Sequence, residues 1–445
     1  MAGVRSRALR HRPGDRGRRG DGHLRELLAN GAADAPALLD GDRVWTYAEL
    51  REKVDAIAAL MSGRELALVR VGPDALSAIG ALAALAAGHA VILLEAGADP
   101  AHILERYDPR YVVEDREVKV REDAAPAELH PDLRLLLSTS GSTGSPKLVR
   151  LTARNVLANA SSIATYLGLD PGERAIASLP ISYSYGLSVL TSHLHAGASV
   201  AFTPHSVIRP EFWDDVRRHE ATSFAGVPYS YAMLERIGMR DMRLPSLRTM
   251  TQAGGRLDPA IALRYAERAR FFVMYGQTEA TARIAYVPPE RLREKAGSIG
   301  IAIPGGALRV SDDGELIYSG PNVMMGYAET RADLARGDEL HGVLPTGDLG
   351  SVDDDGFFSV TGRLKRIAKV FGQRVNLDEV EAAVDGPAGA VAAEDAIDVY
   401  AERGADARAL ARRFRLPPRA FRVHEVDALP VKPSGKVDYA ALADG

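Results

Sequence analysis

The sequence contains no cysteine, which excludes disulfide bonds, thiolate nucleophiles and cysteine-bound zinc or iron–sulfur centres. It also lacks a large charge of one sign. Its 55 lysine and arginine residues meet 59 aspartate and glutamate residues, and the net charge of −4 gives the chain as a whole no electrostatic basis for nucleic-acid binding. Any chemistry must therefore use oxygen and nitrogen side chains.

Long hydrophobic runs are lacking as well. The longest candidate, residues 75–94, is mostly alanine and is broken by Gly88 and His89. We predict a helix over Ala75–Ala87 and a strand over Ala90–Leu94 in place of a membrane span. The arginine-rich residues 1–23 have no apolar segment after Arg18-Arg19, so we expect no export signal and a cytoplasmic protein. These residues are either a disordered tail or the product of an upstream start codon.

Lysine is scarce, with eight residues against 47 arginines. Five of the eight fall in three short segments and are Lys147, Lys365, Lys369, Lys432 and Lys436. An ammonium group on a flexible stem is not equivalent to a guanidinium fork. These lysines are therefore candidates for positions that require lysine, although chance clustering is the alternative.

The order of apolar segments predicts an α/β protein. Short runs such as Leu66–Val71, Leu133–Leu137 and Ser199–Phe202 alternate with segments of helical period such as Asn155–Leu167, which indicates a largely parallel sheet covered by helices. After about residue 300, short strands are joined by Asp-Asp-Gly turns, which favours hairpins and a small β-rich subdomain. We expect a large N-terminal domain over residues 24–362 and a small, shortened α+β domain over residues 363–445.

Two segments place polar residues directly after an apolar strand. Leu135–Val149 runs into eight consecutive serine, threonine and glycine residues, then Pro146 and Lys147, a composition that suits phosphate binding through backbone N–H groups. Its spacing does not fit the Walker A pattern, and a flexible linker is the alternative. Phe271–Ala280 ends in a turn with Thr278 and Glu279, which suits a phosphate-bound Mg²⁺, with a capped turn as the alternative.

Two further segments lie nearer the C-terminus. Leu344–Glu381 contains Asp348 and Arg363, an acidic residue and a guanidinium that suit ribose hydroxyls. Leu429–Tyr439 carries Lys436 in a Pro-Ser-Gly turn, where an ordinary exposed lysine is the alternative.

These four segments, in this order, resemble the adenylate-forming superfamily of acyl- and aryl-CoA synthetases, adenylation domains of nonribosomal peptide synthetases and luciferase-like enzymes. The resemblance begins at Trp45–Leu50 and extends to Lys436, so it covers essentially all of the chain beyond the tail. It implies an ATP- and Mg²⁺-dependent enzyme that converts a small carboxylic acid to acyl-AMP and pyrophosphate. The acyl group would then pass to a thiol of coenzyme A or of a phosphopantetheine carrier protein, with no nucleic-acid or membrane partner.

The resemblance also assigns roles to residues. The residues implied to bind the nucleotide are Ser140, Gly141, Ser142, Thr143, Gly144, Lys147, Gly254, Gly255, Tyr275, Gly276, Thr278, Asp348 and Arg363. Among these, Tyr275 is expected to stack near the adenine and Thr278 to contact the α-phosphate. Catalysis is assigned to Lys436, Lys147, Thr278 and Glu279, with Glu279 as the Mg²⁺ ligand. Lys365 is the implied hinge, and Lys369 and Gly372 the implied acceptor tunnel.

The chain departs from the family pattern where the acid is expected to bind. Tyr183 occupies a position that is histidine in many CoA ligases, and Ser184 stands where amino-acid-activating domains carry an aspartate. Without that counter-charge, an aryl or acyl acid that lacks an α-ammonium group is favoured. The expected pocket residues are Tyr183, Ser184, Tyr185, Tyr229 and Gly254. An amide synthetase with an amine acceptor and a catalytically inactive nucleotide-binding relative are the alternatives.

Overall fold

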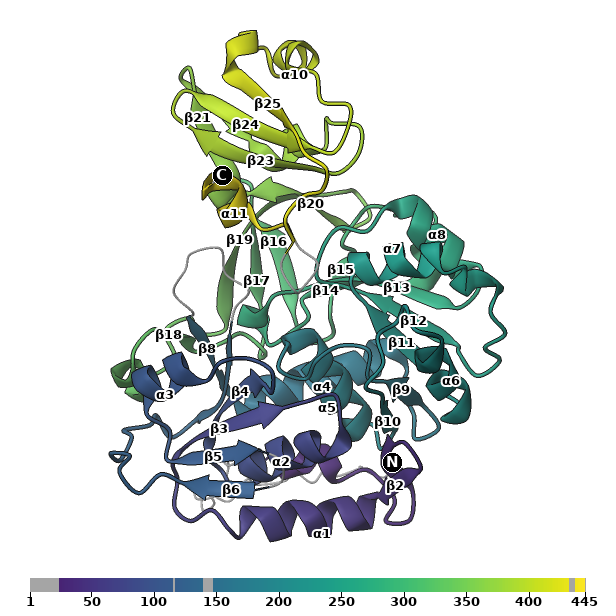
Figure 1. Cartoon of the computed structure of the whole chain (residues 1–445), viewed down its shortest axis with the longest axis vertical. Coiled ribbons are helices and arrows are strands. Elements are labelled where there is room, and N and C mark those ends of the chain that lie inside the picture. The colour runs from purple at the N-terminus through teal and green to yellow at the C-terminus, as the bar shows by residue number, and fades with distance from the viewer. Residues whose placement is uncertain (1–23, 115–116, 139–146, 432–436, 445) are drawn as a thin grey trace, which may run out of the picture.

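The structure, a computed structural model, describes residues 24–114, 117–138, 147–431 and 437–444. Within these ranges its secondary structure forms two large sheets, a smaller hairpin sheet and a C-terminal unit (Figure 1). None of the helices in the described ranges combines the length and the hydropathy needed to span a bilayer. The segment that the sequence predicts as helix and strand, residues 75–94, folds as α2 and β4.

The larger sheet has nine strands and is parallel through its middle. Its order is β15-β14-β13-β12-β11-β9-β10-β1-β2, and the pairs from β13 to β1 are parallel, while β2, β14 and β15 pair antiparallel at the two edges. Its strands are β1 (Pro36–Asp40), β2 (Arg43–Thr46), β9 (Arg174–Ile176), β10 (Ser199–Phe202), β11 (Ser223–Gly226), β12 (Thr249–Gln252), β13 (Arg270–Tyr275), β14 (Ala285–Val287) and β15 (Ile301–Ala302).

The second sheet has seven strands in the order β18-β8-β7-β4-β3-β5-β6. Four neighbouring strands, β7, β4, β3 and β5, are parallel, and the strands outside them are antiparallel. Its strands are β3 (Leu66–Val71), β4 (Ala90–Glu95), β5 (Tyr111–Glu114), β6 (Glu117–Val120), β7 (Leu133–Ser138), β8 (Leu148–Thr152) and β18 (Gly326–Ala328). The expected α/β fold of helices on largely parallel strands is therefore confirmed, and its strands form two sheets.

Helices lie between and around these sheets. The largest hydrophobic core combines residues of both sheets with residues of α1, α2, α4 and α5, and Figure 1 shows α4 and α5 between the two sets of strands. The helices are α1 (Tyr47–Ala58), α2 (Ala75–Ala86), α3 (Ala101–Tyr107), α4 (Ala153–Leu167), α5 (Ser184–His195), α6 (Pro210–Arg218), α7 (Pro228–Arg236) and α8 (Pro259–Ala266). Short 3₁₀ turns are η1 (Leu24–Leu28), η2 (Met239–Asp241), η3 (Thr278–Ala280), η4 (Pro289–Arg291) and η5 (Arg331–Ala335).

Local sequence sets the ends of α4, the helix that follows the phosphate-binding candidate and β8. Thr152 accepts a hydrogen bond from the backbone N–H of Asn155, and the Asn155 side chain accepts one from the backbone of Thr152. This reciprocal cap satisfies N–H groups that the first turn leaves without partners. The helix ends at Gly168, which adopts a left-handed conformation with φ of 65°.

A third sheet forms the hairpin region predicted after residue 300. Its order is β16-β17-β19-β20, all antiparallel, with β16 (Ala307–Val310), β17 (Glu315–Ser319), β19 (Val343–Val352) and β20 (Phe358–Arg363). Strand β19 begins at Val343 because β17 pairs with residues 343–345 as well as with Leu349.

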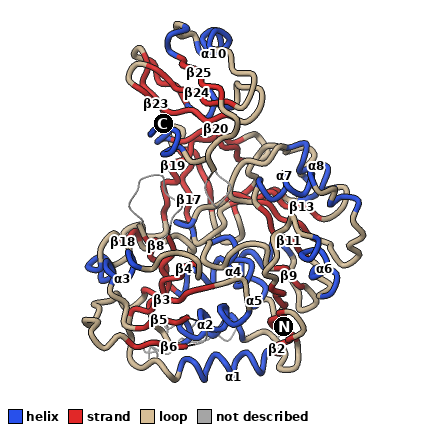
Figure 2. The backbone as a smooth tube through the Cα atoms, viewed as in Figure 1, coloured by secondary structure: helices blue, strands red, loops and turns tan. Residues whose placement is uncertain are grey.

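The C-terminal unit has a core of its own, built only from residues between Ala368 and Phe421 among those described. It follows η6 (Leu364–Arg366) and contains β21 (Ile367–Val370), β22 (Gln373–Asn376), α9 (Leu377–Glu381), β23 (Ala388–Ala393), β24 (Ala396–Ala401), α10 (Ala407–Phe414), η7 (Pro418–Ala420), β25 (Phe421–Glu425) and α11 (Tyr439–Asp444). Figure 2 shows this α+β unit at the top of the view, far from α1 and α2 at the bottom.

Candidate active site

The predicted site residues follow neighbouring strands of the nine-stranded sheet. Because β9, β11, β12 and β13 are parallel and adjacent, their carboxyl ends lie at one edge of the sheet. Gly254 and Gly255 follow β12, and Gly276 through Glu279 follow β13. The loop after β9 leads to Tyr183 at the start of α5. Such an edge is where open α/β sheets bind ligands.

Asp348 in β19 is the centre of a polar cluster at this edge. Asp348 is 3% exposed, and it lies opposite Arg363 in the pairing of β19 with β20. Its Oδ1 accepts a hydrogen bond from Arg363 Nε at 3.1 Å. Its Oδ2 accepts one from Gln277 Nε2 at 2.9 Å and one from the Tyr275 hydroxyl. The structure therefore brings together three residues that the sequence singled out and that lie up to 88 positions apart.

Tyr275 is held as a hydrogen-bond donor in this cluster. Burial raises the pKa of its phenol well above the usual value, and the neighbouring negative charge of Asp348 raises this pKa further. The hydroxyl therefore stays protonated at neutral pH and donates to the carboxylate. Gln277 was not singled out by the sequence; its amide donates to the backbone carbonyl of Thr346 at 2.9 Å as well as to Asp348.

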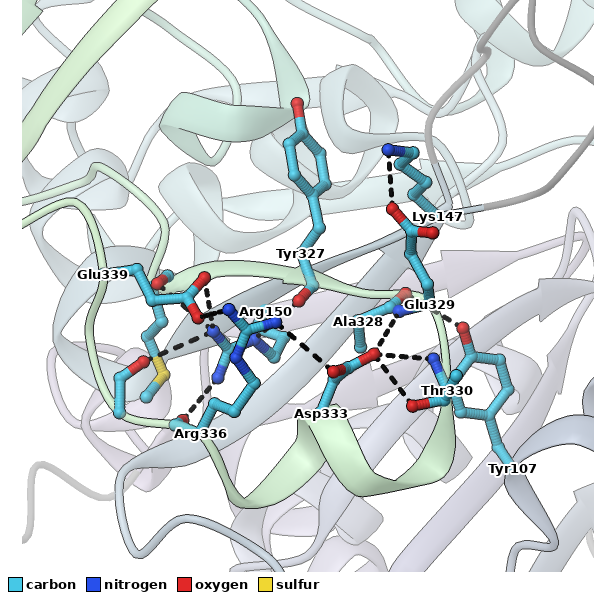
Figure 3. A network of polar contacts seen from close by, with 12 residues as sticks. Tyr107, Lys147, Arg150, Tyr327, Ala328, Glu329, Thr330, Asp333, Arg336 and Glu339 are labelled. Carbon is cyan, nitrogen blue, oxygen red and sulfur yellow. Dashed lines mark hydrogen bonds and ion pairs between the residues drawn. The ribbon is translucent and has the colours of Figure 1, made fainter.

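A second set of contacts joins Glu279 to Lys147 through Tyr327 of β18. Figure 3 shows Tyr327, Lys147 and Glu329 from this set. The Tyr327 hydroxyl donates to Glu279 Oε1 at 2.7 Å. The Lys147 ammonium lies 5.6 Å from the centre of the Tyr327 ring and 2.6 Å from Glu329 Oε1. Burial, and then the charge of Glu279, raise the pKa of the Tyr327 phenol, so the hydroxyl stays protonated at neutral pH and donates its hydrogen bond. One aromatic residue thus links the predicted metal ligand to the predicted phosphate-binding lysine.

Buried side chains of β8 and α3 hold the β18 segment that carries Tyr327 through hydrogen bonds to its backbone (Figure 3). Arg150 in β8 is 0% exposed, lies 3.2 Å from Glu339 and donates to the backbone carbonyl of Tyr327 at 3.1 Å. The Tyr107 hydroxyl donates to the carbonyl of Ala328 at 3.0 Å. These contacts hold the β18 segment against β8, which begins next to Lys147.

The start of α5 faces the turn after β13. Ser184 Oγ lies 3.2 Å from Thr278 Oγ1, so the first residue of the helix meets the residue predicted to contact the α-phosphate. Tyr183 precedes it and is half-buried, and its hydroxyl would lie 2.9 Å from a Cβ placed on Gly254. Gly254 has φ of +89°, a conformation that favours glycine, so a side chain there would be strained and would crowd Tyr183.

The other predicted glycines and pocket residues have distinct surroundings. A Cβ on Gly276 would lie 1.8 Å from the carbonyl oxygen of Ala282, so only glycine fits this turn, and a Cβ on Gly255 would lie 3.2 Å from the Pro228 ring. Tyr185 is 2% exposed and its hydroxyl lies 2.9 Å from Thr251 Oγ1, which places it in the core behind Tyr183. Tyr229 lies on the first turn of α7 and is 52% exposed.

Several predicted residues lie elsewhere or outside the described ranges. Ser140, Gly141, Ser142, Thr143 and Gly144, together with Lys436, are outside them. Lys365 lies in η6, between the hairpin sheet and the C-terminal unit, with its side chain outside the described part. Lys369 is exposed on β21, and Gly372 lies in the turn that joins β21 to β22, with φ of +78° and open space around its Cα.

The acidic side chains fit a metal ion carried by a ligand better than a protein cage. Across residues 24–114, 117–138, 147–431 and 437–444, no three or more histidine, aspartate or glutamate side chains gather as a metal site. The acidic turn near residue 354 is an ordinary turn, because Lys295 lies 2.8 Å from Asp353 and contacts Asp355. Glu279 is a single carboxylate, which is the kind of protein ligand that a phosphate-bound Mg²⁺ uses.

Comparisons with known proteins identify similar chains. Residues 108–328 match the family model of the AMP-binding enzymes. A feruloyl-CoA synthase of an Amycolatopsis species is 33% identical over 270 residues, covering 56% of this chain and 53% of that protein. A 2-succinylbenzoate–CoA ligase of Bacillus velezensis is 32% identical over 265 residues, covering 57% and 53%. The chain thus spans about half the length of the curated relatives it matches.

A solved structure matches over a greater length. The o-succinylbenzoate CoA synthetase from Bacillus subtilis, in complex with its acyl-adenylate intermediate, superposes with a TM-score of 0.77 at 25% identity. The match covers 95% of this chain and 98% of that one, so it includes both the sheets and the C-terminal unit.

Proposed function

Because the chain belongs to the AMP-binding enzymes of the adenylate-forming superfamily, we propose that it activates a carboxylic acid with ATP. The products of this step are acyl-AMP and pyrophosphate. The acyl group then passes to a thiol, for which coenzyme A is the acceptor favoured by the CoA ligases and synthetases among its relatives. The same Bacillus subtilis synthetase has also been solved with ATP and a magnesium ion, at 25% identity.

One observation carries the proposal. The Asp348 cluster, the Ser184–Thr278 contact and the Glu279–Tyr327–Lys147 chain all lie around the turn that follows β13. Along its length, a nucleotide needs acceptors for the ribose hydroxyls, then donors and cations for the phosphates and a carboxylate for the Mg²⁺ bound to them. The residues present supply each of these groups within one turn of chain and its immediate contacts.

In this proposal Asp348 accepts the ribose hydroxyls, while hydrogen bonds from Tyr275 and Arg363 orient its carboxylate. Lys147 neutralises phosphate charge, and the N-terminus of α5 beside Thr278 favours the negative α-phosphate. Glu279 would hold Mg²⁺, which when bound offsets phosphate charge. The acid's carboxylate oxygen attacks the α-phosphorus and pyrophosphate leaves, so the protein needs no nucleophile of its own. Its contribution is to position two anions and to stabilise the charge that develops between them.

The acceptor step is proposed for the C-terminal unit. We place the domain boundary at residues 362–363, at the end of β20 in the hairpin sheet, with Lys365 as the hinge in η6. Support comes from the unit's separate core and from the turn at Gly372, where nothing within 4 Å obstructs the approach of a thin pantetheine arm. Lys369 lies on the strand that leads to this turn. Lys436 is the proposed cation for the adenylation step.

The acid is proposed to lack an α-ammonium group. Ser184 lies 3.2 Å from Thr278 and offers a hydroxyl in place of a counter-charge, and burying an ammonium without a partner is costly. Since ATP and coenzyme A are intracellular co-substrates, we place the reaction in the cytoplasm. A carrier-protein thiol and an amine are the alternative acceptors, and the cluster of intact polar site residues argues against an inactive relative.

Two variants test the proposed division of labour. We expect Lys436→Ala to lose acyl-AMP formation, by about a hundred- to thousandfold, while still converting supplied acyl-AMP to thioester. We expect Gly372→Trp to keep pyrophosphate exchange and to lose thioester formation. Both half-reactions are followed separately, by exchange of labelled pyrophosphate into ATP and by thioester formed from synthetic acyl-AMP. Equal damage to both steps from each variant would exclude two active orientations of the C-terminal unit.

A further inference from the structure

Arg283 is a buried arginine without an anionic partner. It follows the turn that carries Thr278 and Glu279, and it is 2% exposed. In the part of the chain that the structure describes, no ion pair joins its guanidinium to a carboxylate, and its Nε has no hydrogen-bond partner. Removing a guanidinium from water without an opposite charge costs several kcal/mol.

The other buried arginines are neutralised. Arg150 is 0% exposed, lies 3.2 Å from Glu339 and donates to several backbone carbonyls. Arg70 is 9% exposed and lies 3.7 Å from Glu114. Among the buried arginines of the described residues, Arg150 and Arg70 thus each lie within ion-pair distance of a carboxylate, and Arg283 does not.

Tyrosine side chains surround the Arg283 guanidinium in place of acidic ones. Its central carbon lies 3.9 Å from the centre of the Tyr185 ring. Burial raises the pKa of Tyr166 to about 12, and the charge and contact of Arg283 oppose this rise. Burial also raises the pKa of Tyr183, and the charge of Arg283 lowers it. A cation among phenols that remain protonated offers several hydrogen-bond donors and, among these side chains, no negative charge.

The Arg283 guanidinium lies next to the residues of the proposed acid site. Tyr185 belongs to the first turn of α5, next to Ser184 and Tyr183, whose ring centre is 6.3 Å from that of Tyr185. Ser184 in turn contacts Thr278. Neighbouring residues that we place around the acid thus contact the guanidinium, through Tyr185, and Thr278, through Ser184.

We propose that the activated acid carries a second anionic group, a carboxylate or a sulfonate, and that Arg283 binds it. The inference rests on the proposed function and names its substrate class. Arginine pairs with such groups through two parallel N–H donors, which fixes the orientation of the ligand as well as its charge. The second acid group then directs the other carboxylate towards Thr278. In this arrangement Arg283 determines specificity.

The test compares matched acids in the pyrophosphate exchange reaction. Each dicarboxylic acid of an aryl and acyl panel is paired with its half-amide, which keeps the shape and one carboxylate but removes the second charge. For the wild-type chain we expect kcat/KM for the diacid to exceed that for the half-amide by about a hundredfold or more, because the half-amide leaves the buried cation unpaired. A panel of inorganic anions, added with half-amides, distinguishes an anion site from a substrate site.

The variant Arg283→Met should abolish this preference and keep activity on half-amides, while Arg270→Met should keep the preference. Arg270 is a matched control because its guanidinium also lies over a buried ring, that of Phe272 at 5.4 Å, but it is exposed and away from the site. Equal use of diacids and half-amides by the wild type would overturn the inference while leaving the proposed function intact. Restoration of half-amide activation by sulfate or phosphate would identify an inorganic anion site and also overturn it. Absence of exchange with every acid would contradict the proposed function itself.

Discussion

Removing the Tyr327 hydroxyl should weaken Mg²⁺ binding without unfolding the protein. The variant Tyr327→Phe deletes the donor that lies 2.7 Å from Glu279 Oε1 and keeps the ring that faces Lys147. A hydrogen bond to a charged group is worth about 1.5–3 kcal/mol. If Tyr327 orients the carboxylate for the metal, this loss corresponds to about a 10- to 150-fold rise in the Mg²⁺ concentration needed for half-maximal activity.

The assay is pyrophosphate exchange at fixed ATP and acid, titrated with Mg²⁺. The matched control is Tyr107→Phe, because the Tyr107 hydroxyl donates to the carbonyl of Ala328 in the same segment but contacts no carboxylate of the site. We expect Tyr107→Phe to lower thermal stability and to leave the Mg²⁺ requirement unchanged. An unchanged requirement in Tyr327→Phe, or an equal shift in both variants, would refute the reasoning.

Three further variants probe the site and the fold. Glu329→Gln breaks the ion pair with Lys147 and frees the lysine for phosphate, so it should lower the KM for ATP. The decrease should be less than about fivefold, because the pair is half-exposed and worth at most about 1 kcal/mol. A higher KM would show that Glu329 assists binding. Gly254→Ala should lower kcat/KM for the acid about tenfold through strain at a positive φ, and steady-state kinetics that match the wild type would exclude this. Burial lowers the pKa of His193 to about 4 in the folded protein, whereas the unfolded chain has a pKa near 6.5. Between these values only the unfolded state binds the proton, so the stability present above pH 6.5 is lost as the pH falls towards 4. Urea unfolding of His193→Gln should accordingly show a pH slope about 1.4 kcal/mol per unit shallower than the wild type between these values, and identical slopes would contradict the assignment.

The sequence placed residues in one site through four motifs and the family resemblance that they carry. Asp348 lies within β19, opposite Arg363 at the end of β20, and Thr278 follows β13, a parallel strand that the pattern of apolar runs predicted. The same pattern predicted the helices and strands closely, because hydrophobic period depends on local sequence. It could not divide the strands into two sheets, since pairing between distant strands leaves no local signal.

The residues that the sequence missed depend on such distant pairing. Tyr327 and Glu329 reach Lys147 only because β18 pairs with β8, almost 180 positions earlier in the chain. Gln277 lies within a segment already singled out, so its position between Tyr275 and Thr278 was the one available signal. Arg283 could not be recognised, because an unpaired cation is defined by the absence of a neighbouring carboxylate in space.

The central claim is that the acid's carboxylate attacks the α-phosphorus of ATP, and transfer of an oxygen label tests it most directly. An acid that supports turnover is labelled with oxygen-18 in the reacting carboxylate and incubated with ATP, Mg²⁺ and coenzyme A, and the nucleotide products are analysed by mass. Adenylation predicts AMP that carries one oxygen-18 atom, together with unlabelled pyrophosphate. Formation of ADP with the label in inorganic phosphate would show attack on the γ-phosphorus and would contradict the account.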